Sequence, residues 1–156
     1  MKRTIFTLIL MLALGMTANA QESFAKQFKG KEGFTCVTIG KAAMKMMSTK
    51  GKLSREGFSG KLNIGNFADK VERLEVVSAS TPTAADTLSN ECKKWIEKDS
   101  FECIVDVDEN GNQASIYTKT GGDINIFLVL AQDKETSVII IYGTMTLDDI
   151  QGSTGK

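Results

Sequence analysis

The chain has 156 residues, of which 42% are hydrophobic and 24% are charged, a composition typical of a folded globular protein. Its 19 lysines and arginines balance 19 aspartates and glutamates, which gives no electrostatic basis for binding nucleic acid or an anionic membrane. The chain contains no histidine, which excludes Ser-His-Asp and Cys-His catalytic sites and most zinc sites. We therefore expect a protein that is not an enzyme and that uses no cofactor.

The first 20 residues have the three parts of a secretory signal peptide. Lys2 and Arg3 form a basic start, the stretch 5–14 is apolar, and the Ala-Asn-Ala sequence at 18–20 is a cleavage site. The apolar stretch is shorter than the roughly 20 residues of a membrane-spanning helix. We expect cleavage after Ala20, a periplasmic or secreted location, and no stable membrane insertion after cleavage.

The rest of the chain predicts a single domain over 21–151, followed by a frayed tail at 152–156. The spacing of two phenylalanines predicts a short helix within 21–31. A β-branched and aromatic run at 34–39 predicts the first strand, and helical spacing of apolar residues predicts a helix at 41–50.

The second half begins with a predicted strand at 71–78 and a predicted helix at 82–98. Thr81 is a good N-cap, and Pro82 suits the first helical position. The apolar stripe of this helix consists of Ala84 or Ala85, Leu88, Cys92, Trp95 and Ile96. Its solvated face carries Asp86, Glu91, Lys94, Glu97 and Lys98.

Four consecutive strands are predicted after residue 100, and Asn110-Gly111 favours a tight hairpin turn between the first two. Alternation in 101–108 predicts one buried face, whereas the isoleucine run 139–141 predicts a central strand covered on both faces. The fold class that follows is α+β. We expect a two-layer sandwich with a mainly antiparallel sheet of five or six strands and two main helices on one face. The first half is compatible with a ferredoxin-like βαβ start.

Acidic residues around the predicted hairpin suggest two alternative functions. Asp106, Asp108 and Asn110 match the opening of a calcium-binding loop, but Tyr117 stands where the loop needs a bidentate glutamate. We therefore favour the hairpin and expect no metal site, with a calcium-stabilised structural domain as one alternative. A small carboxylate-dependent enzyme using Asp106, Asp108 and Asp123 is the other.

The three cysteines, Cys36, Cys92 and Cys103, are an odd number for an exported protein. Cys92 and Cys103 are both predicted on apolar faces, and the helix and strand that carry them are expected to run antiparallel to each other. The pattern favours three buried, reduced thiols. A Cys92–Cys103 disulfide remains an alternative, although a helix stacked on a sheet is usually too distant for one.

The irregular segment 52–66 contains isolated apolar residues between glycines. Phe58, Ile64 and Phe67 are the first candidates for a binding surface, because irregular loops often carry function. The alternative is that these side chains close the edge of the core. The overall pattern favours a non-catalytic binding or protein-interaction module, whose partner would be an envelope or extracellular protein.

The order of these elements resembles the DUF4252 family, small exported Bacteroidetes proteins of unknown function. The resemblance rests on the signal peptide and on the segments 34–39, 41–47, 74–77, 82–98 and 124–143. It implies a Gram-negative exported location and an α+β fold. It implies no functional residues.

Overall fold

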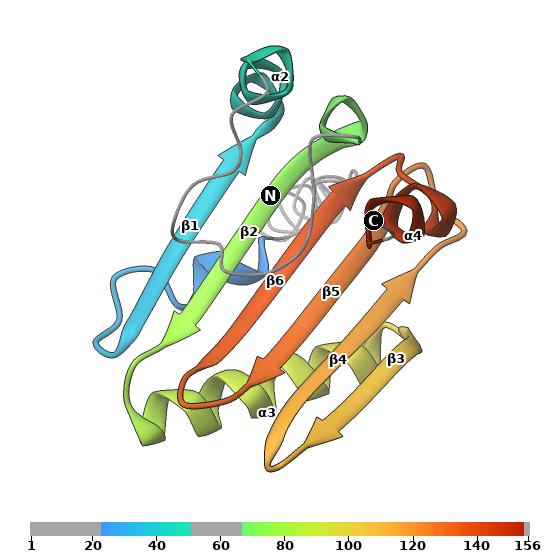
Figure 1. The fold of residues 1–156 in the computed structure, drawn as a ribbon. Coiled ribbons are helices and arrows are strands. Elements are labelled where there is room, and N and C mark those ends of the chain that lie inside the picture. Colours follow the sequence, from blue (N-terminus) through green and yellow to red (C-terminus); the bar gives the residue numbers. More distant parts are fainter. Residues whose placement is uncertain (1–22, 51–66, 155–156) are drawn as a thin grey trace, which may run out of the picture.

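The computed structural model describes residues 23–50 and 67–154 (Figure 1). The predicted signal peptide lies outside these ranges. The elements are η1 (Phe24–Gln27), β1 (Phe34–Gly40), α2 (Lys41–Lys50), η3 (Ala68–Lys70), β2 (Val71–Ala79), α3 (Pro82–Lys98), β3 (Glu102–Glu109), β4 (Asn112–Lys119), β5 (Asn125–Gln132), β6 (Thr136–Gly143) and α4 (Leu147–Thr154). None of the helices in the two ranges combines the length and the apolar character that a membrane crossing requires.

A single six-stranded sheet in the order β1-β2-β6-β5-β4-β3 organises the fold. Every neighbouring pair is antiparallel, which confirms the predicted α+β class. The central position of β6 explains its isoleucine run, because Ile140 and Ile141 point to opposite faces and are both buried.

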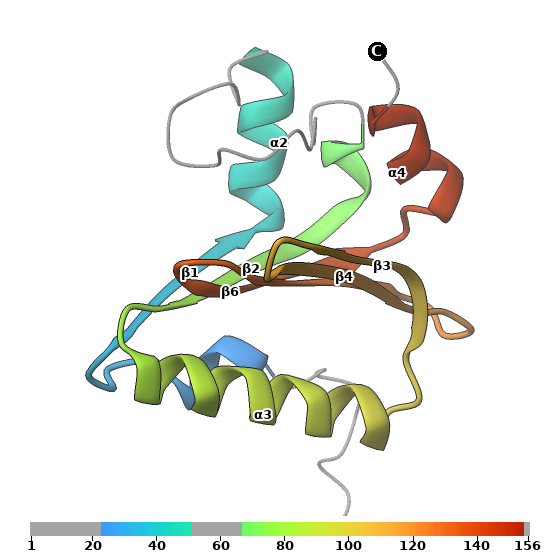
Figure 2. The same ribbon diagram turned by 60° about the horizontal axis from the view of Figure 1, so that its bottom comes forward.

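Helices cover both faces of the sheet (Figure 2). α3 and η1 lie on one face, whereas α2, η3 and α4 lie on the other, so the expectation of two main helices on one face is wrong. The ferredoxin-like start is also wrong, because β1 and β2 are antiparallel neighbours and that motif needs a parallel crossover. The reason is local: α2 begins directly after β1, and its Met44 packs into the core of the same end of the sheet.

The α3 helix forms as its sequence predicts. The Thr81 hydroxyl accepts a hydrogen bond from the backbone N–H of Ala84 at 3.2 Å, which caps the helix ahead of Pro82. Leu88 and Cys92 are fully buried against the sheet. The apolar stripe therefore holds α3 flat on this face and fixes the direction in which its last turns point.

The β3–β4 hairpin has the predicted turn, with positive φ at Asn110 (55°) and Gly111 (84°). The single buried face predicted for 101–108 is wrong, because a register shift between Cys103 and Val105 reverses the alternation along this edge strand. The shift points Val105 away from α3, where it is 41% exposed.

The cysteines differ from one another in burial. Cys92 is buried, Cys36 is half-buried and Cys103 is exposed, and all three thiols are free. The prediction of three buried thiols therefore holds for Cys92 alone. The Cys92–Cys103 disulfide is absent from the structure. Cys103 is exposed because its strand forms the edge of the sheet, beyond the last turn of α3.

Candidate functional site

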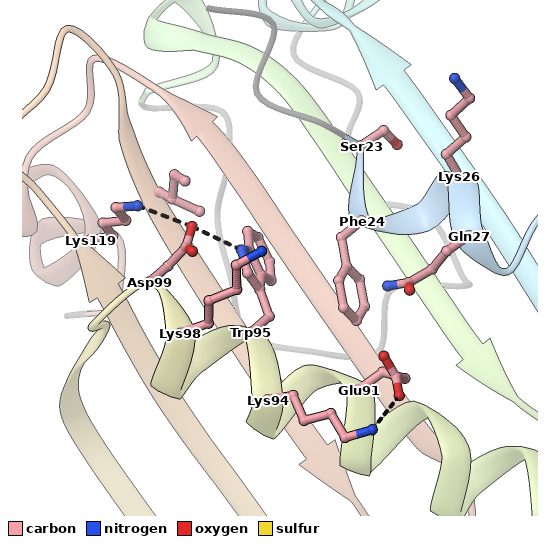
Figure 3. A pocket seen from close by; sticks show the side chains of 11 residues that line it. Ser23, Phe24, Lys26, Gln27, Glu91, Lys94, Trp95, Lys98, Asp99 and Lys119 are labelled. Atoms are coloured by element: carbon pink, nitrogen blue, oxygen red, sulfur yellow. Dashed lines mark hydrogen bonds and ion pairs between the residues drawn. The ribbon is translucent and has the colours of Figure 1, made fainter. Parts of the chain in front are cut away.

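A pocket of about 640 Å³ lies between η1 and the C-terminal half of α3. Figure 3 shows the η1 side chains along one side of the pocket and the α3 side chains along the other. Its lining residues are Ser23, Phe24, Lys26, Gln27, Glu91, Lys94, Trp95, Lys98, Asp99, Lys119 and Ile126.

Aromatic rings form the apolar wall of the pocket. Phe24 stacks on Trp95 with ring centroids 5.1 Å apart and planes inclined by 14°. Phe101 meets Trp95 edge-on at 5.0 Å, so the indole is held between two rings. Ile126 of β5 adds a buried aliphatic surface. The wall is therefore apolar and well fixed in position.

A buried carboxylate fastens η1 to the sheet. Glu75 of β2 is fully buried, and its Oε2 accepts a hydrogen bond from the backbone N–H of Ala25 at 3.1 Å. Its Oε1 lies 2.9 Å from Nε of Arg73, whose guanidinium sits over the Tyr142 ring at 4.1 Å from the centroid. A charge buried this deeply needs such partners.

Tyr142 shares this buried environment. Burial, and then the negative charge of Glu75, raise the pKa of its phenol to about 12. Tyr142 therefore stays neutral at physiological pH. Its ring serves as a platform for the Arg73 guanidinium.

Lysines surround the opening of the pocket. Lys26 comes from η1, Lys94 and Lys98 from α3, and Lys119 from β4, against two carboxylates, Glu91 and Asp99. The lining therefore carries an excess of positive charge, which favours an anionic ligand.

Two of the lysines are engaged by the two carboxylates. Nζ of Lys94 lies 2.9 Å from Oε1 of Glu91. Lys119 Nζ donates to Oδ2 of Asp99 at 3.0 Å, and the indole N–H of Trp95 donates to the same oxygen at 3.1 Å. Asp99 thus joins the end of α3 to β4 and fixes the orientation of the indole.

Both of these donors affect the pKa of the Asp99 carboxyl. Partial burial acts to raise the pKa of this carboxyl, but the hydrogen bonds from Lys119 and Trp95 outweigh burial and hold the pKa below its ordinary value of 3.8. Asp99 is therefore a carboxylate at physiological pH. Its Oδ2 accepts hydrogen bonds from both donors.

The other two lysines, Lys26 and Lys98, make no ion pair with any residue in the part of the chain that the structure describes. Their ammonium groups are consequently available to a ligand. An aromatic wall beside free ammonium groups can bind a molecule that has both an apolar part and a carboxylate or phosphate group.

Phe67, one of the three candidates for a binding surface, does not line this pocket. Phe67 is 1% exposed and belongs to the core between η3, α2 and β2, so for this residue the core alternative is correct. Its ring fills the space beneath α2. Phe58 and Ile64 lie outside the described residues.

The acidic residues of the hairpin are bound to neighbouring side chains. Oδ1 of Asp106 accepts from the Ser115 hydroxyl at 2.6 Å, and Oδ2 of Asp108 accepts from the Gln113 amide at 3.2 Å. Asn110 lies in the turn. Within the described ranges, no three acidic, cysteine or histidine side chains converge on a point that could hold a metal ion.

Sequence reasoning missed the lysine-rich pocket. The helical pattern places Trp95 on the buried side of α3 and Lys94 and Lys98 on its solvated side, where they are unremarkable. Lys26 and Lys119 come from elements far apart in the chain. No local signal could bring these residues together, because the pocket arises from the docking of η1 beside α3.

The structure is a small α+β domain with a lysine-rich pocket between η1 and α3. The chain belongs to the DUF4252 family, a domain of unknown function whose family model matches residues 28–152. This match confirms the resemblance drawn from the sequence. The α3 and β4 sides of the pocket lie within the matched residues, and η1 precedes them. No curated protein and no solved structure matches the chain.

Proposed function

We propose that this protein is an exported, non-catalytic binding domain and that it holds a small organic anion in the pocket between η1 and α3. The observation that carries the proposal is that Lys26 and Lys98, which make no ion pair within the described ranges, lie beside the Phe24–Trp95 wall. The pocket volume of about 640 Å³ falls within the roughly 300–1,000 Å³ of small-molecule sites.

The pocket has a matching surface for each of the two parts of such a ligand. Its carboxylate or phosphate would lie near the lysine ammonium groups, and its apolar part would cover the rings of Phe24 and Trp95 and the side chain of Ile126. The binding energy would come mainly from the apolar contact. Solvent screens ion pairs at an exposed rim, so the lysines would contribute selectivity for charge.

Two further observations support a binding role outside the cytoplasm. Residues 1–20 have the pattern of a signal peptide. Both carboxylates of the pocket, Glu91 and Asp99, are engaged by lysines of the protein. An acid–base catalyst needs a carboxyl group that can exchange a proton with the substrate, so this engagement favours binding over catalysis.

Trp95 makes the proposal directly testable, because it is the only tryptophan of the chain and it lines the pocket. The test titrates residues 21–156 with laurate, benzoate and inorganic phosphate while recording tryptophan fluorescence. We expect saturable binding of at least one organic anion, and roughly ten-fold weaker binding of its neutral counterpart, dodecanol or benzyl alcohol, because the two exposed lysines contribute about three-fold each.

Matched lysine variants assign the binding to the pocket. Lys26→Gln and Lys98→Gln should each weaken binding about three-fold, the value of an exposed ion pair of under about 1 kcal/mol. Lys93→Gln, on the same helix but outside the pocket, should leave the affinity unchanged. Absence of saturation with all three anions, or equal losses in the Lys93 and Lys98 variants, would refute the proposal.

A further inference from the structure

Among the described residues, helices cover one end of the sheet face opposite α3, and none covers the other, bare end. α2, η3 and α4 bury Leu74, Phe127 and Ile141 at the covered end. The next row along the strands crosses the whole six-stranded sheet. In strand order, the residues of this row are Val37, Val76, Ile139, Val129, Ile116 and Val105.

This bare end is uncharged across its full width. The row beyond the first contains only serine, threonine, alanine and valine, so neither row has a charged residue. Two of its hydroxyls, those of Ser78 and Ser137, hydrogen-bond to each other at 3.1 Å. These two hydroxyls therefore depend less on hydrogen bonds to water. A solvated face of an antiparallel sheet normally carries polar side chains at such positions.

The exposed apolar side chains of the protein gather on this side. Val37, Val105 and Val107 on the bare strands are 44%, 41% and 46% exposed. Met46 of α2 (67% exposed) and Leu147 of α4 (39% exposed) lie on the helices that stand above the same face. These five are the large hydrophobic residues with high exposure in the described part of the chain.

We propose that this face is a homodimer interface, occupied by a second copy of the chain. The face has the shape of a step, with helices raised at one end and bare strands at the other (Figure 2). A two-fold rotation about an axis that lies above this face, parallel to the sheet and perpendicular to the strands, seats the helices of each copy on the bare strands of the other. The raised helices would hold a flat lipid surface away from the bare strands.

The area also fits a second copy. Two rows across six strands occupy roughly 400 Å², given about 4.8 Å between strands and about 3.3 Å per residue. A stable interface buries about 800 Å² on each partner. The bare strands alone are too small, so the proposed interface also includes the flanks of α2 and α4, where Met46 and Leu147 are exposed. The ligand pocket is on the opposite face, so a dimer would leave both pockets open.

Sedimentation equilibrium of residues 21–156 tests the proposal over roughly 1–500 μM protein. We expect the mass to rise from that of one chain to that of two. Val37→Lys and Val107→Lys, tested separately, place a charge in the interface and should each weaken dimerisation at least ten-fold. Thr38→Lys is the matched control, because Thr38 is exposed on the same edge strand but faces the other way.

The outcomes separate clearly. A wild-type protein that stays monomeric throughout this range overturns the proposal, whatever the behaviour of the variants. A dimer that survives both valine substitutions in folded proteins, checked by circular dichroism, also overturns it. A dimer that Thr38→Lys disrupts as strongly as Val37→Lys would place the interface at the β1 edge instead.

Discussion

Glu75 and Ala25 are 50 positions apart in the chain, yet the buried carboxylate of one accepts the backbone N–H of the other. This bond fixes η1 on the sheet, and the same carboxylate neutralises Arg73. The position of the aromatic wall of the pocket thus depends on one acidic side chain that does not line the pocket.

Glu75→Ala should lower the free energy of unfolding by about 3–5 kcal/mol, because it removes the buried carboxylate that pairs with Arg73 and accepts the Ala25 N–H. Urea unfolding followed by circular dichroism measures the loss. Glu72→Ala is the control on the same strand: Glu72 pairs with Lys41 at the surface, so the cost should be under about 1 kcal/mol. Equal losses would contradict the anchoring role.

The charge around Trp95 predicts how quenchers reach it. Iodide should quench its fluorescence more strongly, relative to the neutral quencher acrylamide, than it quenches free tryptophan, because the surrounding lysines attract anions. This excess of iodide quenching over acrylamide quenching should fall in Lys98→Gln and persist in Lys93→Gln. High salt should also remove it, since screening shortens the range of the lysine charges. An iodide-to-acrylamide ratio equal to that of free tryptophan would show that the pocket is not cationic.

Asp99 predicts a pH-dependent contribution to stability. Its folded pKa lies below the ordinary value of 3.8, so its stabilisation is fully present above that value and is lost as the pH falls through the depressed folded pKa. Asp99→Asn should therefore cost about 1 kcal/mol at pH 6 and much less at pH 2.5. Urea unfolding at both pH values measures the difference. A cost for Asp99→Asn that is the same at both pH values would be inconsistent with the lowered pKa.

The three thiols should differ in reactivity. Burial raises the pKa of Cys92 to about 12, so at pH 8 only about one molecule in 10⁴ carries the reactive thiolate. Ellman's reagent should modify exposed Cys103 first and half-buried Cys36 more slowly, because burial, and then the charge of Glu75, raise the pKa of that thiol. Cys92 should react only after unfolding. Cys103→Ser should remove the fast phase, and fast modification of all three thiols would contradict the structure.

Gly143, at the end of β6, has no space for a side chain. A Cβ at this position would overlap the Lys70 carbonyl oxygen and lie 2.9 Å from Sδ of Met145. That carbonyl cannot easily move, since it accepts the backbone N–H of Thr144 at 2.9 Å. Gly143→Ala should cost about 2 kcal/mol or more. Gly122→Ala is the control, because the nearest atom to its Cβ would be 3.8 Å away. Similar thermal midpoints for the two variants would contradict the close contact at Gly143.

Local signals in the sequence were enough to predict these helices and strands. Thr81 and Pro82 mark the start of α3, Asn110-Gly111 marks the hairpin, and the isoleucine run identifies the central strand. In each case the physical cause acts within a few residues: a cap, a positive φ, or burial on both faces. These parts of the fold could therefore be read before any tertiary contact was known.

The wrong predictions concern features that are determined by tertiary packing and not by local sequence. A bulge after Cys103 reverses the faces of β3, and no residue type in that strand announces it. The side of the sheet that α2 covers depends on where Met44 finds an unfilled part of the core. The pocket combines lysines from η1, α3 and β4, so it could not be predicted from the neighbours of any one of them along the chain.

The short η1 segment has a consequence for how strongly a ligand binds. η1 is a short segment of four residues, and such short segments open locally at a lower free energy than the whole domain. A molecule with η1 detached lacks the Phe24 ring and the Lys26 ammonium. The apparent affinity is then the intrinsic affinity multiplied by the fraction of molecules with η1 docked. Occupied pockets should in turn protect the η1 amides from hydrogen exchange.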